Sequence, residues 1–560
     1  MLYKGKGPAN ILKNNRFLHM KDVIYRTVDA FNTYNMKKNL NSEASIYQIG
    51  SFSNHCFEEH ILSLKTVLAH KESNNNGIIF FNIDIISFFD RERIGDCVNA
   101  MKKANVNNKA IRLWQEMNRN TTIKVKTPVG ITDGIFVGNC VAQGTISAAL
   151  VSATNLDKGM CEVFDEVEDV VKYGNIRLQP LTYQDDIGDI CSDSNMLRSH
   201  AKFIEKVLDE KKLDAHDDKT GITILGSSKY RQEILRDIEK NPIVLRKFNI
   251  KLKQKVKYLG QILCDNLSES ALATVIDRQA RIKGACIEFK TILEDYSMQR
   301  FAGLEAAVIL WEKALIPSLL NGAGTWIGDI KNTVKLCNNI QDFYWRIILE
   351  VPASCPKVAL QAETGMMDMS LRIEKMKCLL LLKIKNMEGN ALAKQILMRA
   401  EKNGENGLNS EVRDICRRLG IGNLNEVDIC KNDLNFIFKK EQISIIKKKV
   451  EDSSKLSHLK WENFHECAPY FKDKNISNAR MKFRFRTKMT KNIPGNFKNN
   501  FKYNQADMLC SFCPVNLTQE HLLICPKRSK FREDLDMNNL DDIIIYIRRT
   551  LEGDHIDGRK

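Results

Sequence analysis

Long apolar runs are missing from this sequence. Stretches such as Cys378 to Leu382 are far shorter than the ~20 residues that a membrane-spanning helix requires. The residues after Met1 also contain no apolar segment of the kind found in secretory signals. The sequence therefore predicts neither membrane insertion nor secretion. Its sixteen scattered cysteines are expected to be reduced thiols rather than a disulfide framework.

Acidic residues are outnumbered by basic ones. The chain has 69 Asp and Glu against 85 Lys and Arg, and its formal net charge of +16 favours a polyanionic partner such as nucleic acid. Residues 439–502 contain 17 basic and 6 acidic residues, so most of the excess lies in this segment. For a short run such as Lys447-Lys448-Lys449, a solvated helical face is the alternative interpretation.

Internal repeats are also missing, and the chain divides instead by its periodicity. Its 560 residues suffice for about three or four domains. Short apolar runs alternate with amphipathic helical stretches from Gly77 to about Gly260, which predicts a mixed α and β domain. Gly and Pro are sparse from Glu269 to about Met387, where helical periodicity dominates. The Gly- and Asn-rich stretch from Glu401 to Ser410 predicts a linker.

Three acidic residues interrupt apolar segments that predict strands. Asp84 ends the run that starts at Gly77, and Asp185 and Asp186 lie in a predicted hairpin. Adjacent carboxylates repel each other unless a divalent cation neutralises them. If the two strands are neighbours, Asp84 and Asp185 are expected to face each other. Three carboxylates can then hold two Mg²⁺ about 3.5–4 Å apart, which suits nucleotidyl transfer. A solvated acidic turn is the alternative for the pair alone.

The segments around these carboxylates form an ordered set of motifs. Asp84-Ile-Ile-Ser-Phe-Phe-Asp90 resembles palm motif A of reverse transcriptases. Gln143-Gly-Thr-Ile-Ser-Ala-Ala-Leu150 resembles motif B, and Tyr183-Gln-Asp-Asp186 resembles motif C. Lys219-Thr220 and Tyr258-Leu-Gly260 are similar to motifs D and E. All five stand in the order of that family.

The resemblance implies a role for each matching residue. Asp84, Asp185 and Asp186 are the implied Mg²⁺ ligands, and Lys219 is the implied assistant to pyrophosphate departure. Phe89 matches the bulky residue that excludes a ribose 2′-hydroxyl by steric overlap. The implied substrate-contacting residues of motifs B and C are Gln143, Gly144 and Tyr183. Taken without their motifs, Phe89 would be interpreted as a core aromatic and Lys219 as a surface lysine.

The N-terminal segment is similar to the fingers motifs of non-LTR retrotransposon enzymes. Lys4 or Lys6, together with Arg16, are the implied residues that grip the nucleotide triphosphate. Gln48-Ile-Gly50 matches only the start of the family's Gln-x-Gly-Phe segment and lacks the basic residue that usually follows. The predicted contacts between fingers and template are therefore incomplete.

A cysteine and histidine cluster lies near the C-terminus. Cys510, Cys513, His521 and Cys525 are four ligands within sixteen residues, a spacing typical of tetrahedral zinc, with free thiols as the alternative. The segment resembles the C-terminal zinc knuckle of non-LTR retrotransposon reverse transcriptases. Upstream, Met481 to Arg486 alternates aromatic and basic residues, which predicts either a base-stacking surface or a half-buried strand.

The sequence thus predicts an α+β protein with the right-hand architecture of a polymerase. We expect partial fingers at 1–76, a palm at 77–262, a helical thumb and connection at 263–400, a basic helical nucleic-acid-binding region at 401–505, a zinc knuckle at 506–530 and a tail at 531–560. The implied activity is RNA-directed DNA polymerisation of a retrotransposon, with an RNA template, a DNA primer, deoxynucleotides, two Mg²⁺ and one structural Zn²⁺.

Further expectations concern the implied retrotransposon protein as a whole. The resemblance begins within the fingers motifs and includes no endonuclease, so we expect an N-terminally truncated product. Cytoplasm and nucleus are the expected compartments. A catalytically inactive nucleic-acid-binding remnant is the first alternative, and an intron maturase or telomerase-like enzyme is the second.

Overall fold

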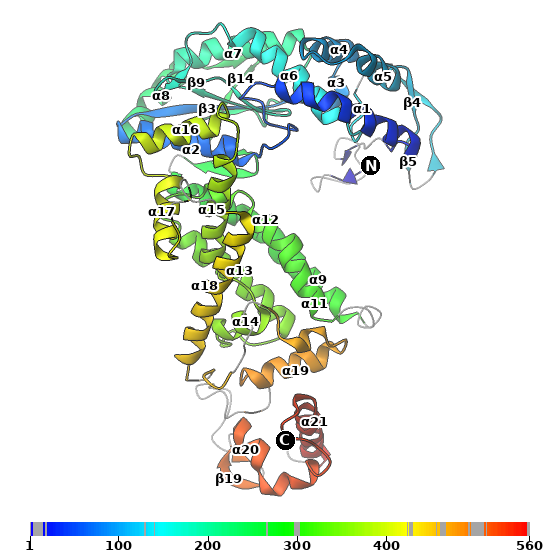
Figure 1. Cartoon of the computed structure of the whole chain (residues 1–560), viewed down its shortest axis with the longest axis vertical. Helices are drawn as coiled ribbons and strands as arrows, with labels where there is room; N and C mark the ends of the chain where they lie inside the picture. The colour runs from blue at the N-terminus through cyan, green and yellow to red at the C-terminus, as the bar shows by residue number, and fades with distance from the viewer. Residues whose placement is uncertain are drawn as a thin grey trace.

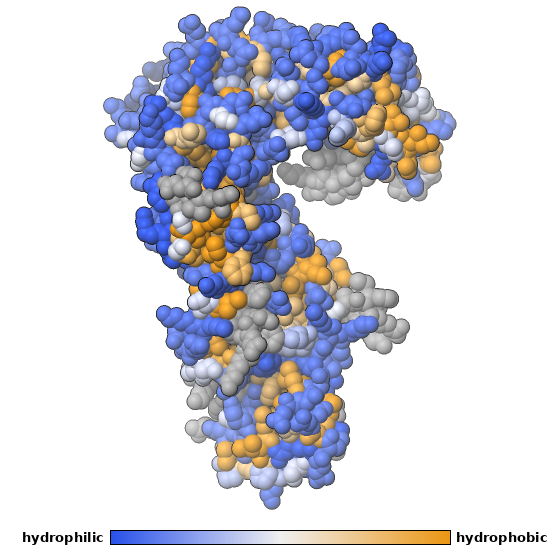
Figure 2. Space-filling model, viewed as in Figure 1, coloured by the Kyte–Doolittle hydropathy of each residue, from blue (hydrophilic) through white to orange (hydrophobic). Residues whose placement is uncertain are grey.

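The chain folds into an N-terminal lobe, a helical column and a small C-terminal unit (Figure 1). The computed structural model describes residues 2–3, 15–16, 20–127, 130–138, 141–264, 267–295, 303–422, 424, 429–454, 456–459, 466–490, 493, 509–510 and 512–556. The lobe lies across one end of the column, and the molecule is hollowed between them (Figure 2).

A five-stranded sheet forms the centre of the lobe, in the order β10-β11-β3-β12-β15. These strands are β3 (Gly77–Asp84), β10 (Leu181–Tyr183), β11 (Asp186–Cys191), β12 (Gly221–Gly226) and β15 (Lys251–Leu252). The pairs β10–β11, β11–β3 and β3–β12 are antiparallel, and β12–β15 is parallel. Residues 77–83 are all buried, which explains why Ile78, Ile79, Phe80 and Phe81 follow one another without alternating polar residues.

Helices cover both faces of this sheet. The helices of the lobe are α1 (Val23–Ser42), α2 (Glu58–Ser73), α3 (Phe88–Arg91), α4 (Ile94–Lys103), α5 (Asn108–Asn118), α6 (Ala148–Phe164), α7 (Ser194–Glu210) and α8 (Ser228–Lys240). In Figure 1, α7 lies above β3 and α2 lies below it. Apolar residues of α2, α7 and the strands share one core, while α1, α4, α5 and the start of α6 enclose a second core.

Two-stranded ribbons complete the lobe. They pair β1 (Leu2–Tyr3) with β2 (Asn15–Arg16), β4 (Thr121–Ile123) with β7 (Ile135–Val137), β5 (Lys126–Thr127) with β6 (Gly130–Ile131), β8 (Val171–Tyr173) with β9 (Ile176–Leu178), β13 (Val244–Leu245) with β14 (Phe248–Asn249), and β16 (Lys255–Tyr258) with β17 (Gln261–Cys264). Ile131, Ile135 and Phe136 are exposed on the ribbon that extends beyond α5.

The column is helical, as the scarcity of Gly and Pro predicts. It comprises α9 (Leu267–Glu294), α11 (Glu305–Leu310), the π-helix η2 (Trp311–Leu315), α12 (Ile316–Leu320), the 3₁₀ helix η3 (Ala323–Thr325), α13 (Lys331–Leu349), α14 (Lys357–Thr364), α15 (Met369–Lys385), α17 (Leu408–Arg418) and α18 (Lys431–Glu451). Helix α16 (Leu392–Lys402), which lies between α15 and α17 in the sequence, joins the core of the lobe instead. Trp311, Tyr344 and Trp345 form the aromatic centre of its larger core.

The predicted linker from Glu401 to Ser410 spans the end of α16, a loop and the start of α17, and its loop makes contacts with the lobe. Helix α16 itself packs against α2. Glu405 accepts a hydrogen bond from the Tyr173 hydroxyl at 2.7 Å, and its other oxygen lies 2.9 Å from Nδ1 of His70. The stretch therefore returns to the sheet domain before α17 begins.

After the column helices come η4 (Pro469–Lys472) and α19 (Ile476–Arg486), whose apolar residues join the larger core of the column. The C-terminal unit contains β18 (Leu509–Cys510), β19 (Cys513–Asn516), α20 (Gln519–Ile524), η7 (Pro526–Phe531) and α21 (Leu540–Ile556). The alternating segment that ends at Arg486 is helical, so the half-buried strand predicted there is wrong. Arg480 and Arg484 bind Glu350, and Arg486 binds Glu363. These ion pairs leave the segment poorly suited to phosphate binding.

The mixed α and β fold class is confirmed. The assignment of its parts to palm, fingers and thumb, and the domain boundaries, stay predictions. Within the described residues, the helices include none with the length and apolarity needed to span a membrane.

Candidate active site and zinc site

Two of the predicted carboxylates lie opposite each other on neighbouring strands. Asp84 is the last residue of β3 and Asp186 is the first residue of β11, and the antiparallel register pairs them directly. Directly opposed residues of an antiparallel pair project their side chains from the same face of the sheet. The expectation that Asp84 faces Asp185 is therefore wrong. Asp185 belongs to the turn before β11, because Tyr183 already pairs with Asp186.

The turn between β10 and β11 consists of Gln184 and Asp185. Gln184 has a φ of 58°, in the left-handed region that residues other than glycine seldom adopt. Such a conformation costs about 1–3 kcal/mol and persists only where the surroundings impose it. The turn places the third carboxylate next to the opposed pair.

The three carboxylates interact electrostatically. Burial, followed by the charges of Asp185 and Asp84, raises the pKa of Asp186 to about 7, and the charge of Lys219 opposes this shift. Nζ of Lys219 lies 2.8 Å from Oδ2 of Asp84, so the lysine neutralises part of the negative charge. Crowded carboxylate oxygens are the ligands that Mg²⁺ binds, and their mutual repulsion favours cation binding. The donor set fits Mg²⁺.

Hydrogen bonds hold the loop that carries Lys219 on both of its sides. The backbone N–H of His216 donates to the Asp84 carbonyl at 2.8 Å. From the other side, Nζ of Lys253 donates to the carbonyls of Asp218 and Lys219. The aliphatic part of the Lys253 side chain packs against Gly221, where a Cβ would lie 2.6 Å from Cε of the lysine. Sequence reasoning missed Lys253. Several lysines follow β12, and no motif distinguishes this one from an ordinary surface lysine.

The motif B residues lie beside motif A. The backbone N–H of Val141 donates to the carbonyl of Phe89 at 3.3 Å, and Phe89 is half-buried. Gly144 has a φ of 105°, which requires glycine. Asp29 of α1 was also missed by sequence reasoning. Its Oδ2 accepts hydrogen bonds from the backbone of Ile146 and Ser147, and it thereby holds the loop that precedes α6.

Other predicted substrate-binding residues are less completely placed. Gln143 and Tyr183 are half-buried. Lys4 and Lys6 lie outside the described residues, and Arg16 is described only as a backbone partner of Leu2 in the β1–β2 ribbon. The triphosphate-gripping roles of these three basic residues stay predictions.

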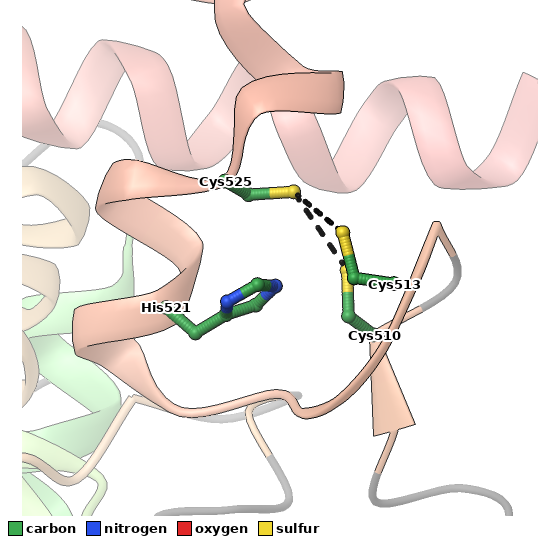
Figure 3. A group of neighbouring side chains, drawn as sticks. All are labelled: Cys510, Cys513, His521 and Cys525. Carbon is green, nitrogen blue, oxygen red and sulfur yellow. Dashed lines mark hydrogen bonds between the residues drawn. The ribbon is translucent and has the colours of Figure 1, made fainter.

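The four predicted zinc ligands meet in the C-terminal unit (Figure 3). Sγ of Cys525 lies 3.9 Å from Sγ of Cys510 and 3.7 Å from Sγ of Cys513. A tetrahedron with zinc–sulfur bonds of about 2.3 Å has an edge of about 3.8 Å. The imidazole of His521 turns toward the sulfurs, and its buried Nε2 has no hydrogen-bond partner among the described residues. The arrangement fits one tetrahedral Zn²⁺ with every position filled by protein.

Local structure places these ligands. Cys510 and Cys513 are paired across the β18–β19 hairpin, and His521 lies in the first turn of α20. The Thr518 hydroxyl accepts a hydrogen bond from the His521 backbone and caps that helix. The backbone of Cys525 ends the same helix. A hairpin and a capped helix thus converge on the site.

Replacing Cys510 with serine is expected to abolish stoichiometric zinc binding, because three ligands hold Zn²⁺ far less tightly than four. Metal content of the purified chain, measured by mass spectrometry, should fall from one Zn²⁺ toward zero. Cys430→Ser is the matched control, since Cys430 is an exposed thiol outside the cluster. Equal zinc content in Cys510→Ser and the control would contradict the site.

Comparisons with known proteins give little guidance. No protein-family model matches the chain, and no curated protein matches it. Solved structures with some similarity include apo telomerase from Candida tropicalis, which is 10% identical with a TM-score of 0.34. The match covers 74% of this chain and 61% of that one. Telomerase from Candida albicans with the TWJ fragment of telomeric RNA is 10% identical, with a TM-score of 0.31, 67% of this chain and 57% of that one covered.

A third structure, apo telomerase from Candida tropicalis truncated from its C-terminal domain, is 14% identical with a TM-score of 0.30, and 43% of each chain is covered. The chain thus spans less than two thirds of each of these structures. At these identities and scores the likeness identifies neither a family nor an activity.

Proposed function

We propose that the chain is an RNA-directed DNA polymerase that adds deoxynucleotides to a primer 3′-hydroxyl. The observation that carries this proposal is the direct pairing of Asp84 with Asp186, with Asp185 in the adjoining turn. The three residues belong to segments that match motifs A and C of reverse transcriptases. Retrotransposon origin of the non-LTR type is part of the proposal and rests on the sequence motifs.

Each residue of the site has a definite task in this reaction. Asp84, Asp185 and Asp186 would hold two Mg²⁺, which activate the primer hydroxyl and neutralise charge on the departing pyrophosphate. Nζ of Lys219 lies 2.8 Å from the Asp84 carboxylate, and in this proposal the lysine assists the departure of pyrophosphate. Phe89 excludes a 2′-hydroxyl by overlap, and Gly144 lets backbone approach the nucleotide without a Cβ.

The hollow between lobe and column is the proposed place for the template and primer (Figure 2). The net charge of +16 supports a nucleic-acid partner. The zinc site would stabilise the C-terminal unit rather than take part in chemistry, because its four ligands leave no open coordination position. Cytoplasm and nucleus are the proposed compartments.

Primer extension tests the proposal. With an RNA template, a DNA primer, deoxynucleotides and Mg²⁺, the chain is expected to extend the primer, and Asp185→Asn is expected to reduce extension to background. The reason is that the amide cannot supply the negative charge that Mg²⁺ requires. Extension products are measured by gel electrophoresis.

The outcome also separates the proposal from its alternative. Extension by the wild-type chain no greater than by Asp185→Asn would reject a polymerase. Salt-sensitive RNA binding without extension would then favour a catalytically inactive nucleic-acid-binding remnant.

A further inference from the structure

The segment from Ser45 to Ser51 lies against the turn that carries Asp185. Gln48 forms a parallel β-bridge with Thr182 of β10. The Thr182 N–H donates to the Tyr47 carbonyl at 2.8 Å, and the Ile49 N–H donates to the Thr182 carbonyl at 3.2 Å. The connection between α1 and α2 therefore extends the sheet beyond its edge strand, next to the proposed active site.

The side chain of Gln48 links this segment to the turn. It is 1% exposed, and its Oε1 accepts hydrogen bonds from the backbone N–H of Gly50 at 2.9 Å and of Gln184 at 3.1 Å. The Gln184 side chain donates in return to the Ser51 hydroxyl. These bonds supply the outside support that the left-handed conformation of Gln184 requires.

Gly50 allows the backbone of the Ser45 to Ser51 segment to contact the backbone of the turn at Gln184. A Cβ at this position would lie 2.3 Å from the backbone nitrogen of Gln184 and 2.8 Å from the carbonyl carbon of Tyr183. Both are backbone atoms and cannot move aside without shifting the turn. Only glycine is compatible with this approach.

A buried carboxylate anchors the segment at its other end. Asp157 of α6 is 1% exposed, and its two oxygens accept hydrogen bonds from the hydroxyl and the backbone N–H of Ser45. The same hydroxyl accepts from the backbone N–H of Tyr47 and Gln48, both at 3.3 Å. Helix α6 begins within motif B, at Ala148. A continuous chain of hydrogen bonds thus runs from α6 through Ser45 and Gln48 to Gln184.

We propose that Asp157, Ser45, Gln48 and Gly50 are positioning residues that fix Asp185 relative to the Asp84–Asp186 pair and thereby set the affinity of the site for divalent cations. This inference rests on the proposed function of the three carboxylates as metal ligands. In this proposal the four residues act through the backbone of Gln184 and not by direct contact with the metal. Supporting residues of this kind commonly change metal affinity or activity by about 10–100-fold when they are lost.

Gln48→Met tests the inference, because methionine preserves the volume but removes the acceptor oxygen. The concentration of Mg²⁺ that gives half-maximal primer extension is expected to rise about tenfold or more, while the KM for deoxynucleotide changes less than about twofold. Gln442→Met is the matched control. Gln442 is 4% exposed and also bonds to backbone, at the Gly365 carbonyl, but it lies on α18 away from the site.

The same effect is expected in metal binding without catalysis. Titration of the chain with Mn²⁺, followed by electron paramagnetic resonance, should show weaker binding for Gln48→Met than for Gln442→Met. Ser45→Ala is a milder variant and should shift binding in the same direction by less. Unchanged metal dependence in a folded Gln48→Met would overturn the inference. An inactive wild-type chain that still binds Mn²⁺ would reject the polymerase proposal alone.

Discussion

Replacing Asp84 with asparagine is expected to slow nucleotide incorporation by about 10³-fold. Loss of one charged metal ligand removes several kcal/mol of charge stabilisation, and each 1.4 kcal/mol corresponds to about tenfold in rate. Single-turnover primer extension at saturating deoxynucleotide measures the rate. More than about a tenth of the wild-type rate in Asp84→Asn would contradict the assigned role.

The same substitution should leave the chain folded. Nζ of Lys219 is paired with Asp84, but the lysine side chain is 59% exposed, so losing the pair costs little. The charge of Asp84 raises the pKa of Asp186, so Asp84→Asn should lower that pKa and relieve repulsion in the metal-free site. Asp414→Asn, which removes an exposed carboxylate on α17, controls for the change in net charge.

Replacing His200 with glutamine is expected to destabilise the chain by about 3–5 kcal/mol at pH 6, the typical cost of breaking a buried ion pair. Nδ1 of His200 lies 2.9 Å from Oδ2 of Asp189, and Nε2 lies 2.7 Å from the Asp169 carbonyl. Because both partners are acceptors, both ring nitrogens must carry protons, which makes the ring an imidazolium. Both side chains of the pair are fully buried.

The stability contributed by His200 should depend on pH. Burial lowers the pKa of His200, but the charge and hydrogen bond of Asp189 outweigh it, so the pKa in the folded chain is raised above 6.5. A raised pKa contributes stability that is complete below the unfolded value and is lost as pH rises through the folded value. The difference between wild type and His200→Gln in urea unfolding should therefore shrink from pH 6 to pH 9.

His70→Gln is the matched control for His200→Gln, because it breaks a similar pair of histidine and carboxylate that is partly exposed rather than buried. His70 also lies 2.9 Å from a carboxylate, that of Glu405, but the two side chains are 32% and 21% exposed. A partly solvated pair of this kind contributes about 1 kcal/mol or less. Equal losses for His200→Gln at pH 6 and pH 9 would contradict the ion-pair assignment.

The buried ion pair and the carboxylate site share one strand. Asp186 and Asp189 are three positions apart in β11, so their side chains project from opposite faces of the sheet. Asp186 faces the proposed reaction site, and Asp189 faces α7, where His200 lies. The strand that presents the proposed metal ligand Asp186 is thus held on its opposite face by the pair of Asp189 and His200, which connects the stability of the fold to the geometry of the candidate site.

Local patterns in the sequence were sufficient for several conclusions. The apolar run ending at Asp84, a hairpin that contains Asp185, the α+β character and the clustering of three cysteines and a histidine near the C-terminus were all predicted correctly. Each depends on neighbouring residues only: strand propensity, a short turn, helix periodicity or ligands a few residues apart. Such features are encoded locally and can be recognised without the tertiary structure.

Contacts between distant segments could not be predicted in the same way. The alternation of Met481 to Arg486 suggested a strand or a nucleic-acid surface. Its arginines instead bind Glu350 and Glu363, more than 100 residues away. The pairing of Asp84 with Asp186 rather than Asp185 depends on how β3 and β11 align. A shift of one residue would exchange the two faces of a strand, and the sequence does not specify that alignment.

The sequence by itself determined which residues can perform the proposed chemistry: three carboxylates in motif order, and three cysteines and a histidine at zinc spacing. Only the tertiary structure decided how they are held. Asp157 and Lys253 carry no motif, and Gln48 belongs to a segment that matches a fingers motif only at its start. Packing nevertheless brings these residues to the turn and to the loop of Lys219. The physical reason is that their contacts join segments that only the assembled core brings together, so no local pattern could reveal them.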